Sequence, residues 1–228
     1  MNELEIVRRI KDRVLNKVTG EARTAVEVEI TRAESEASMR VDLQACTDCP
    51  LAEGCANKVP GVGPMNADIM FVGEAPAEVE THTGIPFTGP SGQLMNKALE
   101  AVGIDRTQYY FTNVCKCRTP DNRTPLVSEV RACYKHLKRE IDYVNPKVIV
   151  CLGGTAANTL IHPDFKVTQE HGSWFELEGK RALAIFHPAY ILYLQDGSEK
   201  QNRAKWDVFN GLKKVKDFRD NGFKDALG

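Results

Sequence analysis

Seven cysteines are spaced along this chain in a way that favours metal binding over disulfide pairing. Cys46 and Cys49 form a C-x-x-C pair, and Cys115 and Cys117 form a C-x-C pair. The other three cysteines stand apart in the sequence: Cys55, Cys133 and Cys151. An odd number of cysteines fits a disulfide framework poorly. A C-x-x-C pair with two distant thiols is what a tetrahedral thiolate site requires, for zinc or for an iron–sulfur cluster. A redox pair is the alternative interpretation, and spacing does not separate zinc from iron.

A glycine- and proline-rich stretch, GEAPAEVETHTGIPFTGPSG, occupies residues 73–92 directly after the apolar run ADIMFV. Its four glycines and three prolines exclude a helix or a central strand. It opens with the carboxylate of Glu74, and two other polar residues also follow apolar runs, Asn113 after YYFT and His187 after ALAIF. Ligands of open α/β sheets bind outside the carboxyl ends of the strands, so these three side chains predict a small-molecule pocket.

Each of these residues alone has an ordinary structural interpretation. Glu74 could be a helix-terminus charge, Asn113 a turn residue and His187 a capped surface imidazole. Together they lack a nucleophile with an adjacent base, which disfavours acyl transfer. The chain also has neither a P-loop lysine nor a G-x-G-x-x-G sequence, so nucleoside triphosphates and dinucleotides are weak candidates.

The elements that must position these residues alternate between strands and helices. Strands are predicted at ADIMFV, YYFTNV and KVIVCLGG, a strand pair at SWFELEGKRALAIF, and helices at SGQLMNKALEAVG, LVSEVRACYKHLKREIDYV, TAANTLI and RAKWDVFNGLKKVKDF. Such alternation implies a parallel sheet with helices on both faces. Residues 1–18 have helical apolar spacing, whereas residues 20–44 fit a strand or a second helix.

The composition is that of a globular protein, with 42% hydrophobic residues, 27% charged residues and a net charge of −1 over 228 residues. No apolar run approaches the roughly 20 residues that span a bilayer. The N-terminus is too charged for a secretory signal, so we expect a cytoplasmic protein. Residues 116–139 and 199–219 are locally basic, with seven basic residues each against two and three acidic ones. Both could contact phosphate, although a solvated helix face is the simpler interpretation.

The motifs GEAPAEVETHTGIPFTGPSG, NVCKCRTPDNRTP and HPAYIL, in this order, resemble those of the uracil-DNA glycosylase superfamily. They most resemble family 4, the iron–sulfur enzymes, over residues 46–218. The resemblance implies a [4Fe–4S] cluster rather than zinc, held by Cys46, Cys49, Cys117 and Cys133, with Cys115 a neighbour only. It also implies a three-layer α/β/α sandwich around a mainly parallel four-stranded sheet, formed by residues 41–228 behind a helical extension of residues 1–40.

The same resemblance implies a role for each site residue. Glu74 and His187 would be catalytic, the carboxylate acting on water or the sugar cation and the imidazole donating toward uracil O2. Phe87 would stack on the flipped base, and Asn113 would read its O4 and N3–H edge. Backbone groups of the glycine loop, at Gly73 and Ala75, would bind the edge of the base. The residues that would contact DNA are Arg118 and Arg123, together with a wedge formed by Tyr190, Ile191 and Leu192. Ordinary core packing is the alternative for Ile191 and Leu192.

We therefore expect an enzyme that removes uracil from single- or double-stranded DNA, acts as a monomer and binds no membrane. The sequence departs from the family at Ala77, where glycine is usual, and at Tyr193, where a basic residue is common. An alanine at a position with positive φ would cost about 1 kcal/mol. No inserted basic loop precedes Phe87, so no covalent DNA adduct is expected. Two alternatives are a catalytically weakened DNA-binding accessory of a viral polymerase-associated replication machinery, and a structural zinc protein that binds nucleic acid.

Overall fold

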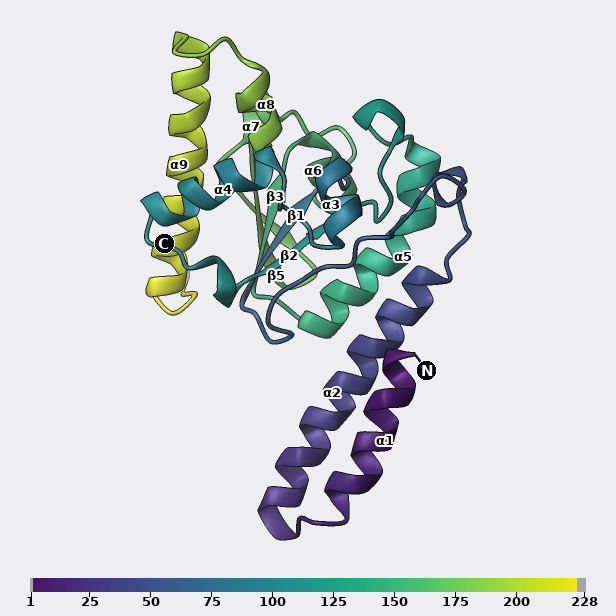
Figure 1. Cartoon of the computed structure of the whole chain (residues 1–228). Helices are drawn as coiled ribbons and strands as arrows, with labels where there is room; N and C mark the ends of the chain where they lie inside the picture. Colours follow the sequence, from purple (N-terminus) through teal and green to yellow (C-terminus); the bar gives the residue numbers. More distant parts are fainter. Residues whose placement is uncertain (1, 225–228) are drawn as a thin grey trace. The chain divides into compact units, whose positions relative to one another are not determined.

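The computed structural model describes residues 2–224 as two compact units that divide between Thr47 and Asp48. The smaller unit is a helical hairpin of α1 (Glu3–Leu15) and α2 (Gly20–Gln44), drawn in purple and blue in Figure 1. The Asn2 side chain accepts a hydrogen bond from Glu5 N at 3.0 Å, and the Glu5 carboxylate accepts one from Asn2 N at 3.1 Å. This capping box fixes the start of α1.

Residues 20–44, for which the sequence left strand and helix open, therefore form a helix. Only three side chains of α2 are buried, Ile30, Ala37 and Leu43. The alternation of AVEVEI does not produce a strand, because residues 2–47, as the structure describes them, contain no second strand to pair with it.

The larger unit contains one five-stranded sheet with the order β2-β1-β3-β5-β4. Its strands are β1 (Ile69–Gly73), β2 (Tyr110–Asn113), β3 (Val148–Leu152), β4 (Trp174–Leu177) and β5 (Lys180–Ile185). The sheet is mainly parallel, as expected, but it has five strands rather than the expected four, because β4 joins β5 antiparallel at the edge. Every residue of β1, β2 and β3 is buried, which fits their unbroken apolar runs.

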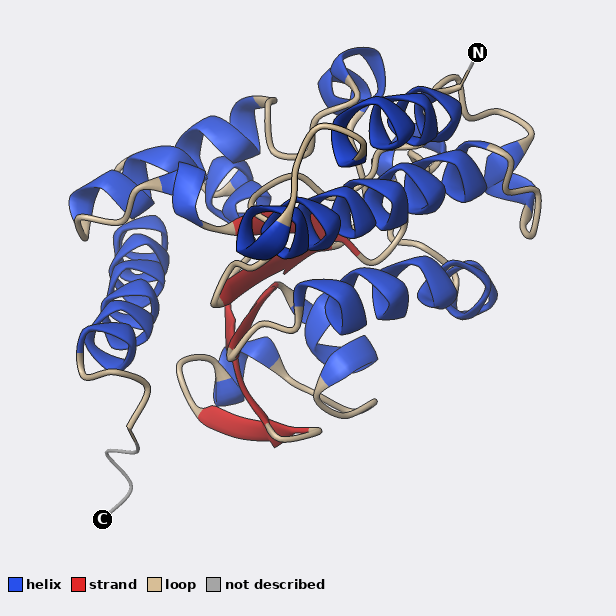
Figure 2. Cartoon of the chain, turned by 90° about the horizontal axis from the view of Figure 1, so that it is seen from below, coloured by secondary structure: helices blue, strands red, loops and turns tan. Residues whose placement is uncertain are grey.

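Helices cover both faces of this sheet, which confirms the predicted α/β class (Figures 1 and 2). On one face, side chains of β1 such as Phe71 pack against α4 (Pro90–Ala101) and α9 (Glu199–Asp220). On the other, alternate residues such as Val72 pack against α5 (Val127–Val144) and α6 (Gly154–Leu160). The remaining helices are short: α3 (Glu78–Thr83), α7 (Val167–Glu170), α8 (Pro188–Tyr193), and the 3-10 turns η1 (Pro50–Ala52), η2 (Arg106–Gln108) and η3 (Pro120–Asn122).

Parallel pairing brings the carboxyl ends of the strands to one edge of the sheet. Gly73 and Asn113 are register partners at the ends of β1 and β2, and His187 follows β5 by two residues. The residues that the sequence singles out at three strand ends therefore meet at a common edge. Among residues 2–224, no helix is both long enough and apolar enough to cross a membrane.

Candidate active site

The side chains of Asn113 and Phe87 both lie against the backbone of Gly73. A Cβ at Gly73 would come within 2.4 Å of Asn113 Oδ1 and 2.6 Å of Phe87 Cζ. No real side chain tolerates such contacts, so only glycine allows the amide and the ring to approach this strand end together. This close approach is between protein groups, and the approach of the glycine-loop backbone to a base stays a prediction.

Phe87 has a backbone conformation that phenylalanine rarely adopts. Its φ is +59°, in the left-handed region, and its side chain is buried against Phe111 with ring centroids 5.8 Å apart. Gly92 makes this turn feasible, since a Cβ there would lie 1.9 Å from the Phe87 carbonyl oxygen. A strained conformation that its surroundings enforce is typical of a functional position.

Arg106, which sequence reasoning missed, fastens the loop that carries Phe87. Its guanidinium donates to the carbonyl oxygens of Phe87 at 3.2 Å and Pro86 at 2.8 Å, and to Asn96 Oδ1 at 2.7 Å. Nothing in the sequence around Arg106 signals this role, because its partners lie ten to twenty residues earlier in the chain.

Glu80 closes the same loop from its other side. The buried carboxylate accepts hydrogen bonds from Gly89 N at 2.9 Å and from Ala77 N at 3.2 Å. Ala77 has a φ of −94° and is exposed, so alanine carries no backbone strain there. The cost considered for the departure from glycine at this position is therefore absent.

A buried ion pair supports Asn113 from beneath. Lys116 is fully buried, and its Nζ donates to Glu140 Oε2 at 2.6 Å, Thr112 Oγ1 at 2.5 Å and the Asn113 carbonyl oxygen at 2.9 Å. The other Glu140 oxygen accepts from Gly61 N at 2.9 Å. The sequence counts Lys116 in a basic segment that could contact phosphate, but the structure turns this side chain inward. The partner on α5 is distant in sequence, so the pattern gave no sign of it.

His187 presents one defined nitrogen to the site. It is the N-cap of α8, and its Nδ1 accepts a hydrogen bond from Ala189 N at 3.1 Å. Nδ1 therefore carries no proton, which places the proton of the neutral ring on Nε2. Burial lowers the pKa of His187 to about 4, opposed by the charge of Glu80. At neutral pH the imidazole is a neutral Nε2–H donor, and its ring centroid lies 6.4 Å from that of Phe87.

Glu74 follows Gly73 directly and is half-buried. Burial raises the pKa of this carboxyl, and a hydrogen bond from the Thr155 hydroxyl opposes the rise. Thr155 lies in the first turn of α6, after β3, so a fourth strand end, besides those of β1, β2 and β5, contributes to the site. Sequence reasoning missed Thr155, although a hydroxyl beside two glycines after a buried strand is the available signal.

Five of the seven cysteines lie close together in the larger unit. Hydrogen bonds join the thiols of Cys55 and Cys117 and those of Cys115 and Cys133, and Cys49 lies near enough to Cys115 to contribute to the rise of its pKa. Cys46 follows α2 at the end of the smaller unit, three residues before Cys49. Cys151 is buried in β3 instead. A gathering of thiols is a donor set suited to a soft transition metal or an iron–sulfur cluster.

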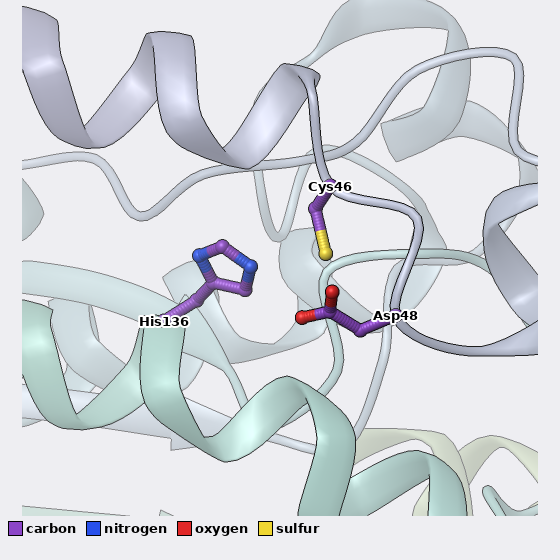
Figure 3. Close-up of side chains that lie close together, drawn as sticks. All are labelled: Cys46, Asp48 and His136. Carbon is purple, nitrogen blue, oxygen red and sulfur yellow. The ribbon is translucent and has the colours of Figure 1, made fainter.

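His136 lies on α5, one helical turn after Cys133. Its imidazole faces the carboxylate of Asp48 (Figure 3), which also pairs with Lys135. The buried Nε2 atom of His136 has no hydrogen-bond partner within residues 2–224. A bound water or ion would satisfy a buried nitrogen of this kind.

The side chains expected to contact DNA differ in their surroundings. Arg118 lies 3.5 Å from a Glu78 carboxylate oxygen, and Arg123 forms two hydrogen bonds with the buried carboxylate of Glu129. On α8, Ile191 is buried in the core, Tyr190 stacks on Phe186, and Leu192 is 47% exposed. Of the three residues expected to form the wedge, Leu192 is thus the one whose side chain faces solvent.

Comparison with known proteins agrees with this geometry. The family model of the uracil DNA glycosylase superfamily matches residues 60–213, and the chain belongs to this family. Type-4 uracil-DNA glycosylase of Archaeoglobus fulgidus is 41% identical over 67% of this chain and 80% of its own. The type-4 enzyme of Thermotoga maritima is 37% identical over 82% of this chain and 96% of its own. A DNA polymerase of Bacillus phage SP01 is 30% identical over 58% of this chain but only 14% of its own.

Proposed function

We propose that this protein is a uracil-DNA glycosylase that flips uracil out of DNA and hydrolyses its N-glycosidic bond, leaving an abasic site. The observation that carries the proposal is the arrangement at Gly73, where the Asn113 amide and the Phe87 ring lie against one glycine. Enzymes that act on a base inside DNA must extrude it into a shaped pocket that reads its hydrogen-bonding edge. The type-4 enzymes named above support the same activity.

Base recognition falls to Phe87 and Asn113. The Phe87 ring gives a flat surface on which a planar base stacks. The Asn113 amide donates to uracil O4 and accepts from N3–H, whereas cytosine places a donor opposite a donor. Lys116 holds the Asn113 backbone through its carbonyl oxygen, so the amide starts from a fixed strand end. Gly73 and Ala75 supply backbone groups along the edge of the base.

Bond cleavage leaves negative charge on the departing uracil and positive charge on the sugar. His187 stabilises the first of these by donating from Nε2–H to O2, as a preorganised donor that keeps its proton. Its pKa of about 4 makes it a hydrogen-bond donor rather than an acid at neutral pH. The Glu74 carboxylate stabilises the sugar cation and orients the water whose oxygen bonds to C1′, while the N1–C1′ bond breaks. The attacking water releases one proton to solvent as its oxygen bonds to C1′, and the leaving uracil anion takes a proton from solvent.

A [4Fe–4S] cluster bound by Cys46, Cys49, Cys117 and Cys133 fits the thiols of this chain. When bound, it supplies structural cross-linking rather than redox chemistry. Cys117 lies four residues after Asn113, which ends β2, and Cys133 lies on α5. These two ligands would therefore join the strand end that reads the base to a helix that covers one face of the sheet. Residues 1–40 would then be a helical extension attached before the first ligand.

DNA would contact the edge of the sheet where the strands end. Leu192 enters the duplex as the wedge, with Tyr190 and Ile191 holding its helix, and apolar wedges offset a few kcal/mol of unstacking. Arg118 and Arg123 would contact phosphates after exchanging their carboxylate partners. One molecule carries the complete set of residues, so we propose that it acts as a monomer on single- or double-stranded DNA.

Alkaline cleavage of a uracil-containing oligonucleotide tests the proposal, because abasic sites break in alkali. We expect cleavage at the uracil with the wild-type protein and a loss of about 100-fold or more with Glu74→Gln. An oligonucleotide with thymine at the same position is the matched control and should remain intact. An intact uracil strand after incubation with iron-loaded wild-type protein would contradict the proposal and favour the accessory role.

A further inference from the structure

A groove between α4, α8 and α9 lies beside the proposed wedge and takes no part in the mechanism above. Its volume is about 360 Å³, and its walls are apolar side chains. Its lining includes Met95 and Ala98 of α4, Pro188 and Ile191 of α8, and Trp206 and Phe209 of α9. We call it the α4–α9 groove.

Trp206 is the unusual member of this groove. Its side chain is 62% exposed, although tryptophan is a costly residue to leave in water, and it stacks on Phe209 with ring centroids 5.6 Å apart and planes 15° apart. The pair presents a flat aromatic surface at the mouth of an apolar recess. Exposed aromatic surfaces of this kind mark interaction sites.

The cations around the groove lack acidic partners. Lys97 on α4 and Lys205 on α9 line the groove and are exposed, and neither forms an ion pair with any residue in the described part of the chain. Lys205 donates instead to the neutral amide of Gln201 at 2.9 Å. In contrast, Lys213 and Lys216, further along α9, each pair with an aspartate. Unneutralised positive charge therefore surrounds the aromatic surface.

The groove is also continuous with the surface proposed to meet DNA. Pro188 and Ile191 form one of its walls, and the next residue after Ile191 is the exposed Leu192. Trp206 lines the same groove as Pro188 and Ile191, so a strand bound at the wedge would lie beside it. Stacking aromatic side chains beside a row of cations is the arrangement that binds single-stranded nucleic acid without sequence preference.

We propose that the α4–α9 groove is an accessory site for single-stranded DNA. An unpaired base next to the uracil stacks on Trp206, and Lys97 and Lys205 contact the flanking phosphates. This inference rests on the proposed function for its substrate, but its ligand is any single strand and needs no uracil. Bases within a duplex are already stacked, so the site should favour single strands over duplexes.

The fluorescence of Trp206 tests the site directly. The chain has two tryptophans, and Trp174→Phe leaves Trp206 as the only one. Adding an oligothymidylate without uracil should quench this fluorescence saturably, and a duplex of equal length should quench it far less. Trp206→Ala should weaken single-strand affinity about tenfold, whereas Trp206→Phe should retain most of it.

Charge is tested with two lysines. Lys97→Ala should reduce the affinity for single-stranded DNA and the salt dependence of that affinity. Lys147→Ala should change neither, because Lys147 is paired with Asp68 next to the start of β3.

Uracil excision separates the two proposals. Quenching without excision would refute the glycosylase and support the groove. If the protein excises uracil, single-stranded DNA does not quench Trp206, and Trp206→Ala binds single strands as tightly as the wild type, the groove is not a DNA site.

Discussion

At the scale of single residues, the hydrogen bond from Thr155 to Glu74 controls a charge that the proposed chemistry needs. Burial raises the pKa of Glu74, and this bond is the interaction that opposes the rise. Because only the ionised carboxylate stabilises a sugar cation, activity should fall as the pH drops through this pKa.

Thr155→Ala removes the opposing bond, so the pKa of Glu74 rises further. We predict that the acidic limb of the pH–rate profile moves to higher pH, with little change above neutrality. Thr159→Ala is the matched control, since its hydroxyl donates to the Thr155 carbonyl at 2.7 Å and does not contact Glu74. The measurement is initial excision rate against pH. Identical acidic limbs in wild type and Thr155→Ala would show that Glu74 does not titrate in the reaction.

At the scale of elements, the strands were predictable and their tertiary partners were not. Runs such as KVIVCLGG are too apolar and too short for anything but a buried strand, and this run forms β3. Residues 20–44 have weaker periodicity, so their helix could not be chosen from sequence. Lys116 shows the limit most clearly, because a lysine in a basic segment looks solvent-exposed until a carboxylate 24 residues away is brought under it.

The Lys116–Glu140 pair joins the segment that follows β2 to α5, and removing one partner of the pair should destabilise the protein far more than removing both. Lys116→Met leaves a buried carboxylate unpaired, for which about 3–5 kcal/mol of destabilisation is expected. Lys116→Met with Glu140→Gln should recover much of that loss, because the amide oxygen still accepts from Gly61 N. Urea unfolding of the three proteins measures this. Equal stability of the single and double variants would mean that the pair is not coupled.

At the scale of the whole molecule, the thiols connect segments that are far apart in the chain. The order of the motifs indicated which cysteines resemble ligands, but no motif indicated that Cys55 lies in hydrogen-bond contact with Cys117. That contact depends on how the loop after η1 returns to the sheet, which only the folded chain defines.

We predict that Cys133→Ser loses its iron and most of its folded protein, while Cys55→Ser keeps both. Serine at position 55 can still donate to the Asn57 carbonyl, as the thiol does at 3.1 Å. Iron per chain and visible absorbance of the purified variants give the answer. Wild-type iron content in Cys133→Ser would remove this residue from the ligand set, and iron loss in Cys55→Ser would add Cys55 to it.

The most direct test of the account is how Asn113 distinguishes uracil from cytosine. Asn113→Asp replaces the amide donor by carboxylate oxygens, so uracil O4 would face a negative charge. Sites that leave buried polar groups unpaired against the wrong ligand discriminate by roughly 10⁴. The measurement is the rate of free base released from single strands that contain uracil or cytosine. We predict that Asn113→Asp keeps its iron, loses most uracil release and narrows or reverses the preference over cytosine. Uracil release at the wild-type rate would contradict the account, because Asn113 would then not read the base.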